Sequence, residues 1–429
     1  MTAVAAAADA LDRIGADGRA GIWIEVGERA EVLAAAALVD RRVAAGERLL
    51  LAGRTLAVKD NIDVAGFPTT AGCPAYAYRP DRSAAAVEAL VAAGAVVVGK
   101  TNLDQFATGL VGTRSPYGVC PNAHWPGLIS GGSSSGSAVA VASGLVDLAL
   151  GTDTAGSGRV PAAANGIVGL KPTRGRLSTA GVVPACRSLD CVSVFAMSVA
   201  EARSAADLAA AGPVVGDPWR RRAPAGPPSQ PGPVRIGVPR DVDLTFDGDT
   251  QGADRFADAL GGLLSALDAP AVALVDLTPF LDLGRLLYEG SFVAERYEAV
   301  GRFVAEHPAD VDPVVGPIIV AAGRQPGWAV FRDLTERERV VRATASVWDR
   351  IDALVVPSVP RIPTVAEVEA DPIGVNAMLG TYTNFVNLLD LAAVTIPVGG
   401  DGSGPPPSLT LIGPAWSDAR LAEIAATIA

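Results

Sequence analysis

Amphipathic segments of helical period alternate along this chain with short segments that are almost wholly apolar. Residues 1–50 are rich in alanine at helical spacing, which predicts a helical N-terminal segment. Residues 83–93 (SAAAVEALVAA) predict a further helix, with Ser83 as its N-cap and Gly94 just past its end. The AVVVG that follows is apolar throughout, as is typical of a strand buried on both faces of a parallel sheet.

The same alternation continues to the end of the chain. A strand at 54–64 runs into a loop, and a small-residue helix at 137–145 precedes a strand at 146–151. The later alternating segments are 234–238, 250–267, 272–277, 279–305, 329–350, 353–358, 380–390, 393–398, 408–412 and 417–428. This pattern predicts an α/β fold with a large mixed, mostly parallel central sheet that helices cover on both faces.

A proline-rich stretch at 213–233 interrupts the alternation. Its composition indicates a solvated excursion or linker, and we expect the strands on its two sides to share one sheet. The chain is therefore expected to form a single domain over residues 1–429. Its expected parts are the helical segment at 1–50, a core at 50–200 that carries the chemistry, and a portion at 234–429 that completes the sheet on the substrate side.

Composition narrows the classes of protein. Hydrophobic residues make up 49 % of the 429 residues, enough to bury a large core. The net charge of −11 argues against binding to nucleic acid or to an anionic membrane surface, although a local arginine could still bind a small anion. Asp9 and Asp12 stand near a start that lacks basic residues, so no signal peptide is expected. The four cysteines show no metal-ligand spacing and predict reduced thiols in a cytoplasmic protein.

Two motifs match enzyme signatures by pattern alone. GAVVVGKT (94–101) fits the P-loop, but a helix precedes it and its Ala-Val-Val-Val favours a strand, whose amides pair within a sheet and not with phosphate. GSSSG (132–136) fits the nucleophile elbow of α/β-hydrolases, which needs an acid and then a histidine downstream. His307 is the only histidine after it. Nucleotide binding is therefore disfavoured, and the elbow is kept as the weaker alternative.

Lysine is scarce in this sequence. Of 35 basic residues only Lys59, Lys100 and Lys171 are lysines, and the chain has two histidines. Arginine stays protonated in proteins, so a lysine is required wherever an amine must lose its proton. For any one of these three lysines, chance or packing explains its presence about as well as a functional role does. Lys59 is singled out because it ends a predicted strand upstream of two Gly/Ser loops, SGGSSSGS (130–137) and GTDTAGSGR (151–159).

Those two loops are joined by a small-residue helix and contain groups that amide hydrolysis needs. Glycine and serine are common in turns, and either loop alone would be interpreted in that way. Together they offer serine nucleophiles and successive backbone amides that can hold an oxyanion. The amides concerned belong to Thr154, Ala155, Gly156 and Ser157. A lysine kept neutral by desolvation could act as the base that histidine usually provides.

Four motifs occur in order and together resemble the amidase signature family: KDNIDVAGFPTTAG, GKTNLDQFATG, SGGSSSGSAVAVA and GTDTAGSGRVPAA. The resemblance implies that Ser157 is the nucleophile and that Lys59 is the base. It also implies that Ser133 is a relay serine held by a cis peptide bond. The residues expected to brace these loops by hydrogen bonds are Ser134, Thr152, Asp153 and Arg159.

A narrower resemblance, to the allophanate hydrolase branch of that family, rests on four segments: TDTAGSGRVPAA with its Ala155, 167–196, LLYEGSFVAERY (286–297) and LGTYTNFVNLLDL (379–391). It implies that Tyr288 and Arg296 hold the carboxylate of the substrate. Residues eight apart on a helix share one face, and the arginine fork suits a planar carboxylate. Without the resemblance, two ordinary residues of an amphipathic helix would be the better interpretation.

The resemblance implies cleavage of the terminal amide of a small carboxylated urea, allophanate, through an acyl-enzyme on Ser157 with release of ammonia. It implies no metal and no organic cofactor, and we expect a homodimer. Allophanate hydrolases usually carry a further C-terminal domain, which here is a separate protein, was removed or is not needed. The alternatives are another amidase-signature enzyme (a biuret-type hydrolase, a broad amidase or one chain of an amidotransferase) and a non-catalytic scaffold.

Overall fold

One central sheet of eleven strands organises the protein. The computed structural model describes residues 1–212, 216–224, 233–400, 402 and 404–428. The strands in chain order are β1 (Trp23–Val26), β2 (Thr55–Lys59), β3 (Val96–Thr101), β4 (Leu148–Asp153), β5 (Val168–Lys171), β6 (Cys191–Ala196), β7 (Arg235–Pro239), β8 (Ala271–Val275), β9 (Ala353–Pro357), β10 (Ala392–Pro397) and β11 (Ser408–Gly413).

The strands lie in the order β1-β3-β2-β4-β6-β5-β10-β11-β9-β7-β8, so the large mixed sheet is confirmed. The expected excess of parallel pairs is not found. Among the described strands four neighbouring pairs are parallel and six are antiparallel. An apolar run covered on both faces looks the same in either direction, because periodicity reports burial and not the direction of the partner strand.

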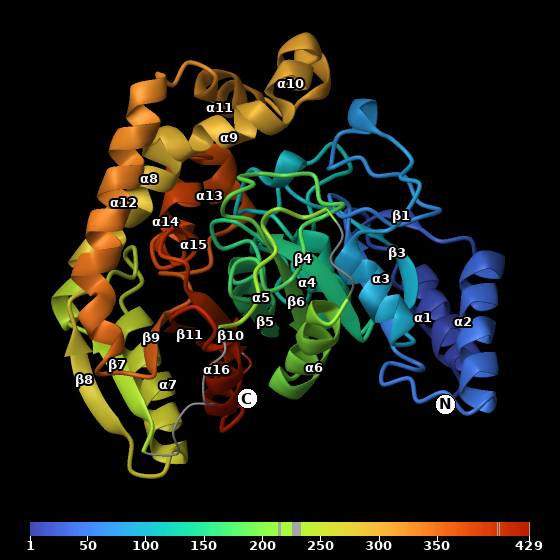
Figure 1. The fold of residues 1–429 in the computed structure, drawn as a ribbon, viewed down its shortest axis with the longest axis horizontal. Coiled ribbons are helices and arrows are strands. Elements are labelled where there is room, and N and C mark those ends of the chain that lie inside the picture. Colours follow the sequence, from blue (N-terminus) through green and yellow to red (C-terminus); the bar gives the residue numbers. More distant parts are fainter. Residues whose placement is uncertain (213–215, 225–232, 401, 403, 429) are drawn as a thin grey trace.

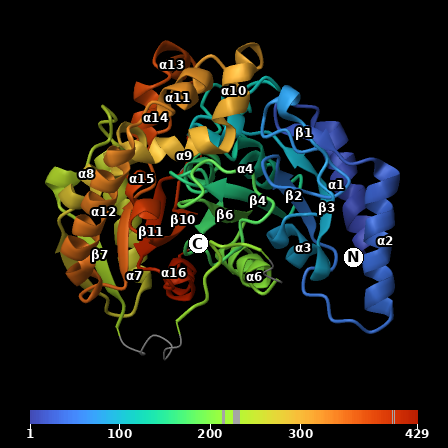
Figure 2. The ribbon, with the colours of Figure 1, turned by 45° about the horizontal axis from the view of Figure 1, so that its top comes forward.

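Helices cover both faces of this sheet, as Figures 1 and 2 show. In chain order the helices are α1 (Ala3–Asp17), α2 (Arg29–Ala44), α3 (Ala85–Ala92), α4 (Ser135–Ala142), α5 (Val160–Asn165), α6 (Val199–Ala210), α7 (Gly252–Ala266), α8 (Thr278–Glu289), α9 (Ala294–Arg296), α10 (Arg302–Glu306), α11 (Val315–Ala322), α12 (Gly327–Trp348), α13 (Val365–Ala370), α14 (Gly374–Leu379), α15 (Asn384–Leu388) and α16 (Asp418–Ala425).

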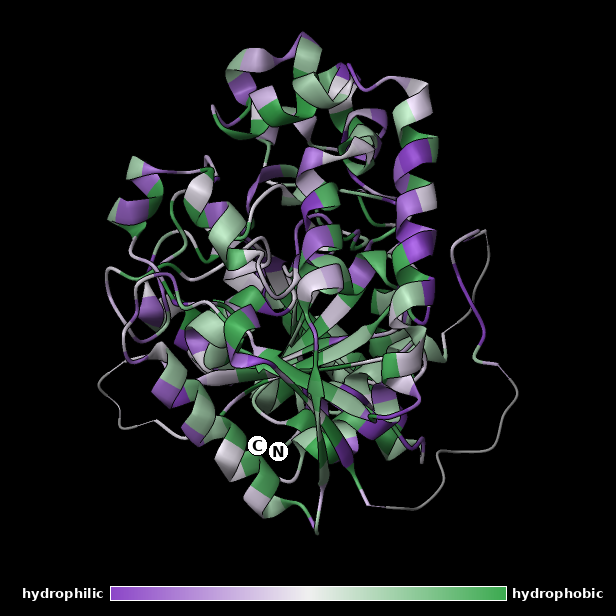
Figure 3. Ribbon diagram, turned by 90° about the vertical axis from the view of Figure 1, so that its left-hand side faces the viewer, coloured by the Kyte–Doolittle hydropathy of each residue, from purple (hydrophilic) through white to green (hydrophobic). Residues whose placement is uncertain are grey.

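Each strand sends alternate side chains to two different cores. On β2, Leu56 and Val58 join the core that α3, α6, α7 and α16 cover, whereas Ala57 joins the opposite core beneath α1, α2 and α4. Further along the sheet that opposite face packs against α8, α12 and α15. Figure 3 shows the central strands in hydrophobic colours and the surrounding helices in alternating ones, as this layered burial requires.

The N-terminal segment departs from the expectation of helix throughout 1–50. Between α1 and α2 the four residues Trp23–Val26 form the edge strand β1, which pairs antiparallel with β3. A four-residue strand is too short to show a period of two against helical neighbours. Ser83 is also not the N-cap of α3; that position is Ala84, and the Ser83 hydroxyl instead accepts a hydrogen bond from the Ala65 amide at 2.9 Å.

The sheet crosses the proline-rich stretch as expected, because β5 from before it pairs with β10 from after it. Of that stretch, 213–215 and 225–232 lie outside the described residues, so the prediction of a linker there is not tested. The rejected P-loop motif is strand β3, as its valines predicted. No helix in the described ranges is both long and apolar enough to cross a membrane. All four cysteines are free and buried.

Candidate active site

Lys59 ends strand β2 with its amine inside the protein. The side chain is fully buried, and Nζ donates hydrogen bonds to Ser133 Oγ at 2.8 Å and to Thr152 Oγ1 at 2.7 Å. Burial lowers the pKa of Lys59 to about 7, against an opposing influence of nearby carboxylates of which Asp104 is the strongest. A lysine in this state is neutral in a large fraction of molecules near neutral pH and can accept a proton.

Ser133 and its loop are fixed by short-range contacts. The Gly132–Ser133 peptide bond is cis, as the family resemblance implied. Gly132 is required because a Cβ at that position would lie 2.0 Å from Asp104 Oδ2. Ser134 Oγ donates to the Thr152 carbonyl at 3.1 Å and accepts from the Thr152 amide at 3.3 Å. The bracing role predicted for Ser134 and Thr152 thus has a geometric basis, since these bonds tie the two Gly/Ser loops together.

Ser157 lies in the second loop, between β4 and α5, and is nearly buried. Within the described residues its hydroxyl makes no hydrogen bond, so only Lys59 and Ser133 of the predicted triad are bonded directly. The Gly156 amide donates to Asp153 Oδ1 at 3.1 Å and is therefore not free for an oxyanion, unlike the sequence-based expectation. A buried carboxylate needs donors, and it takes this one. The amides of Thr154, Ala155 and Ser157 make no hydrogen bond to another described residue.

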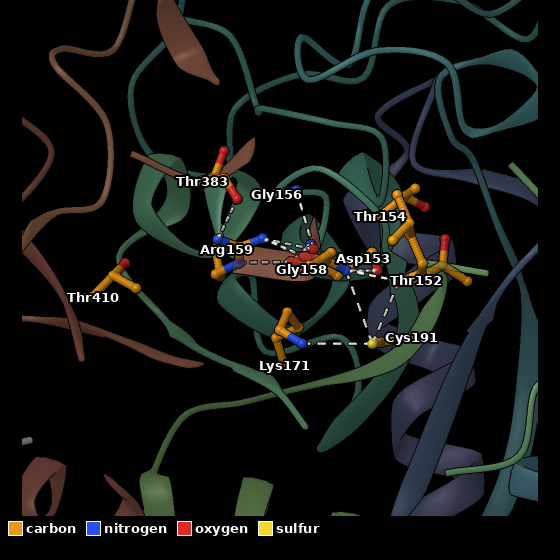
Figure 4. A network of polar contacts seen from close by, with 12 residues as sticks. Thr152, Asp153, Thr154, Gly156, Gly158, Arg159, Lys171, Cys191, Thr383 and Thr410 are labelled. Atoms are coloured by element: carbon orange, nitrogen blue, oxygen red, sulfur yellow. Dashed lines mark hydrogen bonds and ion pairs between the residues drawn. The ribbon is translucent and has the colours of Figure 1, made fainter. Parts of the chain in front are cut away.

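Arg159 and Asp153 brace the loop of the predicted nucleophile Ser157, residues 151–159, which we call the nucleophile loop (Figure 4). Both are fully buried, and Arg159 donates from Nε at 2.9 Å and from Nη2 at 2.8 Å to the two carboxylate oxygens. Burial alone would raise the pKa of Asp153, but Arg159, together with Lys171 and the Gly158 amide, holds that pKa below its usual value. Arg159 also donates to the Thr383 carbonyl and to Asn387 Oδ1.

Asn387, on α15, was missed by reasoning from the sequence. Its Nδ2 donates to the Asp153 carbonyl at 2.9 Å and to the Leu189 carbonyl at 3.0 Å. Asp190 was missed as well: its buried carboxylate accepts from Thr154 Oγ1 at 2.5 Å and from the Cys186 amide at 3.1 Å. Burial raises the pKa of Asp190. No local pattern marks either residue, because their partners are distant in the sequence or lie in an irregular turn.

Tyr288 and Arg296 do meet, but not on one helix as the sequence predicted. Helix α8 ends at Glu289, and Gly290 has extended backbone angles (φ −95°, ψ −170°). A 3-10 turn at Ser291–Val293 and the short α9 follow, which places Arg296 on a different axis from Tyr288. The Arg296 guanidinium nevertheless stacks 5.5 Å from the centroid of the Tyr288 ring. The pair is therefore assembled by a helix break and not by helical periodicity.

Arg296 is a buried cation that forms no ion pair with a described carboxylate, although Asp190 and Glu295 lie near enough to raise its pKa. It is 1 % exposed. Its Nη1 donates to Thr108 Oγ1 at 2.9 Å, whereas Nε and Nη2 have no hydrogen-bond partner. An unpaired buried charge is costly, and two parallel N–H groups match a carboxylate. This arrangement suits an anion supplied from outside the chain.

The other two lysines have different surroundings. Lys100 forms a buried ion pair with Asp60 at 2.8 Å, and Lys171 donates to the Pro172 carbonyl at 2.8 Å and to Cys191 Sγ at 3.5 Å (Figure 4). Neither donates to a serine. His307 has a side chain that is 46 % exposed and lies 3.7 Å from Asp310. The nucleophile-elbow alternative is therefore wrong, because the central serine of that motif, Ser134, bonds to Thr152 and not to a histidine.

The fold and this geometry define an α/β enzyme with a fully buried lysine that is hydrogen-bonded to a serine. Comparison with known proteins gives the family. Residues 23–422 match the family described as Amidase. The chain therefore belongs to the amidase family.

Three relatives illustrate the breadth of that family. The chain is 46 % identical to a urea amidolyase of Lachancea kluyveri over 382 residues, covering 88 % of this chain and 21 % of that protein. It is 34 % identical to a glutamyl-tRNA(Gln) amidotransferase component of Deinococcus deserti, covering 92 % of this chain and 86 % of that one. The structure of Kluyveromyces lactis allophanate hydrolase superposes with a TM-score of 0.93 at 42 % identity, covering 100 % of this chain and 70 % of that one. The chain thus spans about a fifth of the length of the urea amidolyase.

Proposed function

We propose that this chain is an allophanate hydrolase, which cleaves the terminal amide of allophanate and releases ammonia. The observation that carries the proposal is the buried Arg296 guanidinium, whose Nε and Nη2 have no partner among the described residues. The substrate carboxylate would supply that partner, with Tyr288 stacked beside the guanidinium. Identities of 42–46 % to Kluyveromyces lactis allophanate hydrolase and to a urea amidolyase support the same substrate.

In the proposed mechanism, neutral Lys59 accepts a proton from Ser133 as Ser133 takes one from Ser157. The Ser157 oxygen attacks the terminal amide carbon, and the free amides of its loop stabilise the oxyanion. The proton returns through Ser133 to the leaving nitrogen, so ammonia departs and an acyl-enzyme remains on Ser157. Water, activated by the same pair, then releases the acyl group as a carboxylate. Arg296 and Tyr288 hold the substrate in place throughout.

A second candidate is a hydrolase of another small amide. The supporting observation is the 34 % identity to the glutamyl-tRNA(Gln) amidotransferase component over 86 % of that protein, whose name indicates a different substrate. The two candidates differ in the group beyond the scissile amide: allophanate brings a carboxylate, and a simple amide brings none. The buried Arg296 guanidinium, with two N–H groups that lack an acceptor among the described residues, favours the carboxylate, because a neutral substrate would leave it without an ion pair.

The test is ammonia release from allophanate, biuret, malonamate, glutamine and a simple neutral amide. We expect allophanate to have the highest kcat/KM of the five. Replacement of Arg296 by Ala should lower kcat/KM for allophanate by about 100-fold, since a charge-assisted hydrogen bond contributes about 1.5–3 kcal/mol, and should leave the neutral amide within about threefold. Equal losses on both substrates would contradict the proposed role of Arg296.

Ser157→Ala serves as the matched chemical control. It should abolish turnover of every substrate while leaving the unfolding midpoint unchanged, because the Ser157 hydroxyl makes no hydrogen bond to the described residues. Turnover retained in this variant would remove Ser157 as the nucleophile, and with it the acyl-enzyme mechanism.

The remaining proposals concern the setting of the enzyme. We propose a single domain over residues 1–429, a homodimer and a cytoplasmic location. Two exposed aromatic side chains on one face of α12, Trp328 and Phe331, support self-association. Sedimentation over a range of concentrations tests the dimer, and a species of monomer mass at every concentration would contradict it.

A further inference from the structure

A cavity of about 510 Å³ adjoins the proposed substrate site at Tyr288. The side chain of Tyr288 stacks against Arg296 and also lines this cavity, so one aromatic ring is common to both. Besides Thr245, the polar side chains around the cavity include Arg114, Arg285, Glu289, Asn376, Thr381 and Asn384. They come from the loop after β3, from α8, and from the segment that contains α14 and the start of α15.

Arg114 is a second buried cation beside this site. It is 3 % exposed and forms no ion pair with a described carboxylate. Its Nη1 donates to the Thr108 carbonyl at 3.1 Å and its Nη2 to the Pro372 carbonyl at 2.5 Å, while Nε has no partner. Thr108 is shared, because its hydroxyl accepts from Arg296. Two guanidinium groups that form no ion pair in the described chain therefore donate to the same threonine.

Asn384 supplies a second unpaired polar group to the same cavity. Its Oδ1 is buried without a hydrogen-bond partner in the part of the chain that the structure describes. The preceding residue, Thr383, accepts from Arg159 and lies against the nucleophile loop, where a Cβ at Gly156 would come within 2.5 Å of Thr383 Oγ1. The cavity thus has at its wall the ring that stacks on Arg296 and, at Asn384, the neighbour in sequence of a residue that contacts the loop of Ser157.

The proposed reaction creates a second carboxylate. Hydrolysis of the terminal amide converts the allophanate monoanion and water into ammonium and a dianion with a carboxylate at each end, so one new carboxylate forms in each turnover. Arg296 compensates only the carboxylate that the substrate brings. A buried carboxylate without a cation is costly, whereas a guanidinium compensates it well.

We propose that the cavity is a second carboxylate-binding subsite in which Arg114 is the cation and Asn384 a polar contact. This inference rests on the proposed function and extends it to a second position for small carboxylates. The ligand has two sources that share one chemistry: the incoming substrate and the departing dicarboxylate product. Arg285, exposed at the same cavity, is the matched control, because its charge is screened by water and contributes less.

The experiment measures steady-state kinetics on allophanate and a neutral amide, together with inhibition by malonate, a stable isostere of the dicarboxylate. For Arg114→Gln we expect the malonate inhibition constant or the KM for allophanate to rise at least about tenfold, the loss of one charge-assisted hydrogen bond. The neutral amide and the Arg285→Gln variant should change less than about threefold, and Arg114→Lys should restore part of the loss. A higher KM for allophanate in Arg114→Gln assigns the subsite to the incoming substrate. Weaker inhibition by malonate with an unchanged KM assigns it to the departing product.

A second variant keeps the inference falsifiable where Arg114→Gln does not fold. Asn384→Asp adds a negative charge to the cavity. It should weaken the binding of allophanate and of malonate and leave kcat/KM for the neutral amide unchanged. Calorimetric titration of malonate into Ser157→Ala protein needs no turnover, so it tests the subsite even where allophanate is not the substrate. Unchanged malonate binding and unchanged kinetics in folded Arg114→Gln or in Asn384→Asp would overturn the subsite.

Discussion

At the scale of single residues, the proposed chemistry depends on Lys59, because burial lowers its pKa to about 7 and leaves the amine able to accept a proton near neutral pH. Lys59 is enclosed completely and donates to two hydroxyls, Ser133 and Thr152, but it has no carboxylate within ion-pair distance among the described residues. Lys100 is as deeply buried, yet its partner is Asp60 at 2.8 Å. Lys59 and Lys100 are therefore equally buried and differ in the groups that their amines contact, which are hydroxyls for Lys59 and a carboxylate for Lys100.

The pKa of Lys59 sets the expected pH dependence of activity. Below its value of about 7 the amine is protonated and cannot accept the Ser133 proton, whereas above it the neutral form dominates. We therefore expect kcat/KM to rise about tenfold per pH unit on the acid side and to level off above pH 7, since kcat/KM reports the free enzyme. A pH–rate profile measured on the neutral amide checks this without any change in the charge of the substrate.

Lys59→Arg is the matched control for that profile. Arginine keeps the positive charge and part of the hydrogen-bonding capacity but cannot lose its proton, so activity should fall about 100-fold or more at every pH. A variant that keeps both the rate and the inflection near pH 7 would show that another group is the base.

At the scale of elements, the nucleophile loop is held by a buried ion pair that reaches across to α15. Arg159 joins the Asp153 carboxylate to the Thr383 carbonyl (Figure 4). Arg159 also donates to Asn387, which in turn donates to the Asp153 carbonyl. Residues more than 220 positions apart in the chain thereby fix one loop. Every charged oxygen of Asp153 has a donor, which is the condition under which a buried carboxylate is stable.

Removal of Arg159 should therefore destabilise the fold as well as the loop. Arg159→Ala leaves Asp153 buried without its cation, and we expect a loss of about 3–5 kcal/mol in the free energy of unfolding, measured by denaturant titration. Arg302→Ala is the control, because that side chain is 90 % exposed in its pair with Glu306 and should give no measurable change. Similar small effects in both variants would show that the buried pair is not a stabilising brace.

At the scale of the whole molecule, one sheet brings together groups from both ends of the chain. Strands β5 and β10 pair directly, and one core contains Leu56 and Leu148 from the first half with Val355 and Leu409 from the second. Lys59 and Ser133 come from the first half and Arg296 from the second. The two halves therefore share a core that neither can complete alone.

This shared core predicts cooperative unfolding. We expect one thermal transition, with the same midpoint from tryptophan fluorescence and from far-ultraviolet circular dichroism, since tryptophans such as Trp23 and Trp348 report on both halves. Calorimetry should give equal calorimetric and van't Hoff enthalpies. Two separated transitions would contradict the single domain proposed for residues 1–429.

The sequence by itself determined most of the element positions and the α/β class, because apolar periodicity and the alternation of segments are local properties. It also indicated Lys59 and the two Gly/Ser loops, since a scarce residue type and paired small-residue loops are visible without coordinates. Family resemblance, also a property of the sequence, supplied roles for Ser133, Ser157 and Arg296 and the cis bond before Ser133.

Only the tertiary structure decided the direction of the strands and the partners of buried charges. Strand pairing depends on which edge a chain segment reaches, so six antiparallel pairs could not be inferred from apolar runs. The helix break at Gly290 also became visible only in the fold. The same is true of the hydrogen bond that occupies the Gly156 amide and of the contacts that Asn387 makes with distant residues. Hydrogen-bond partners are likewise decided in three dimensions, and the buried N–H groups of Arg296 and Arg114 that have none among the described residues became visible only in the fold.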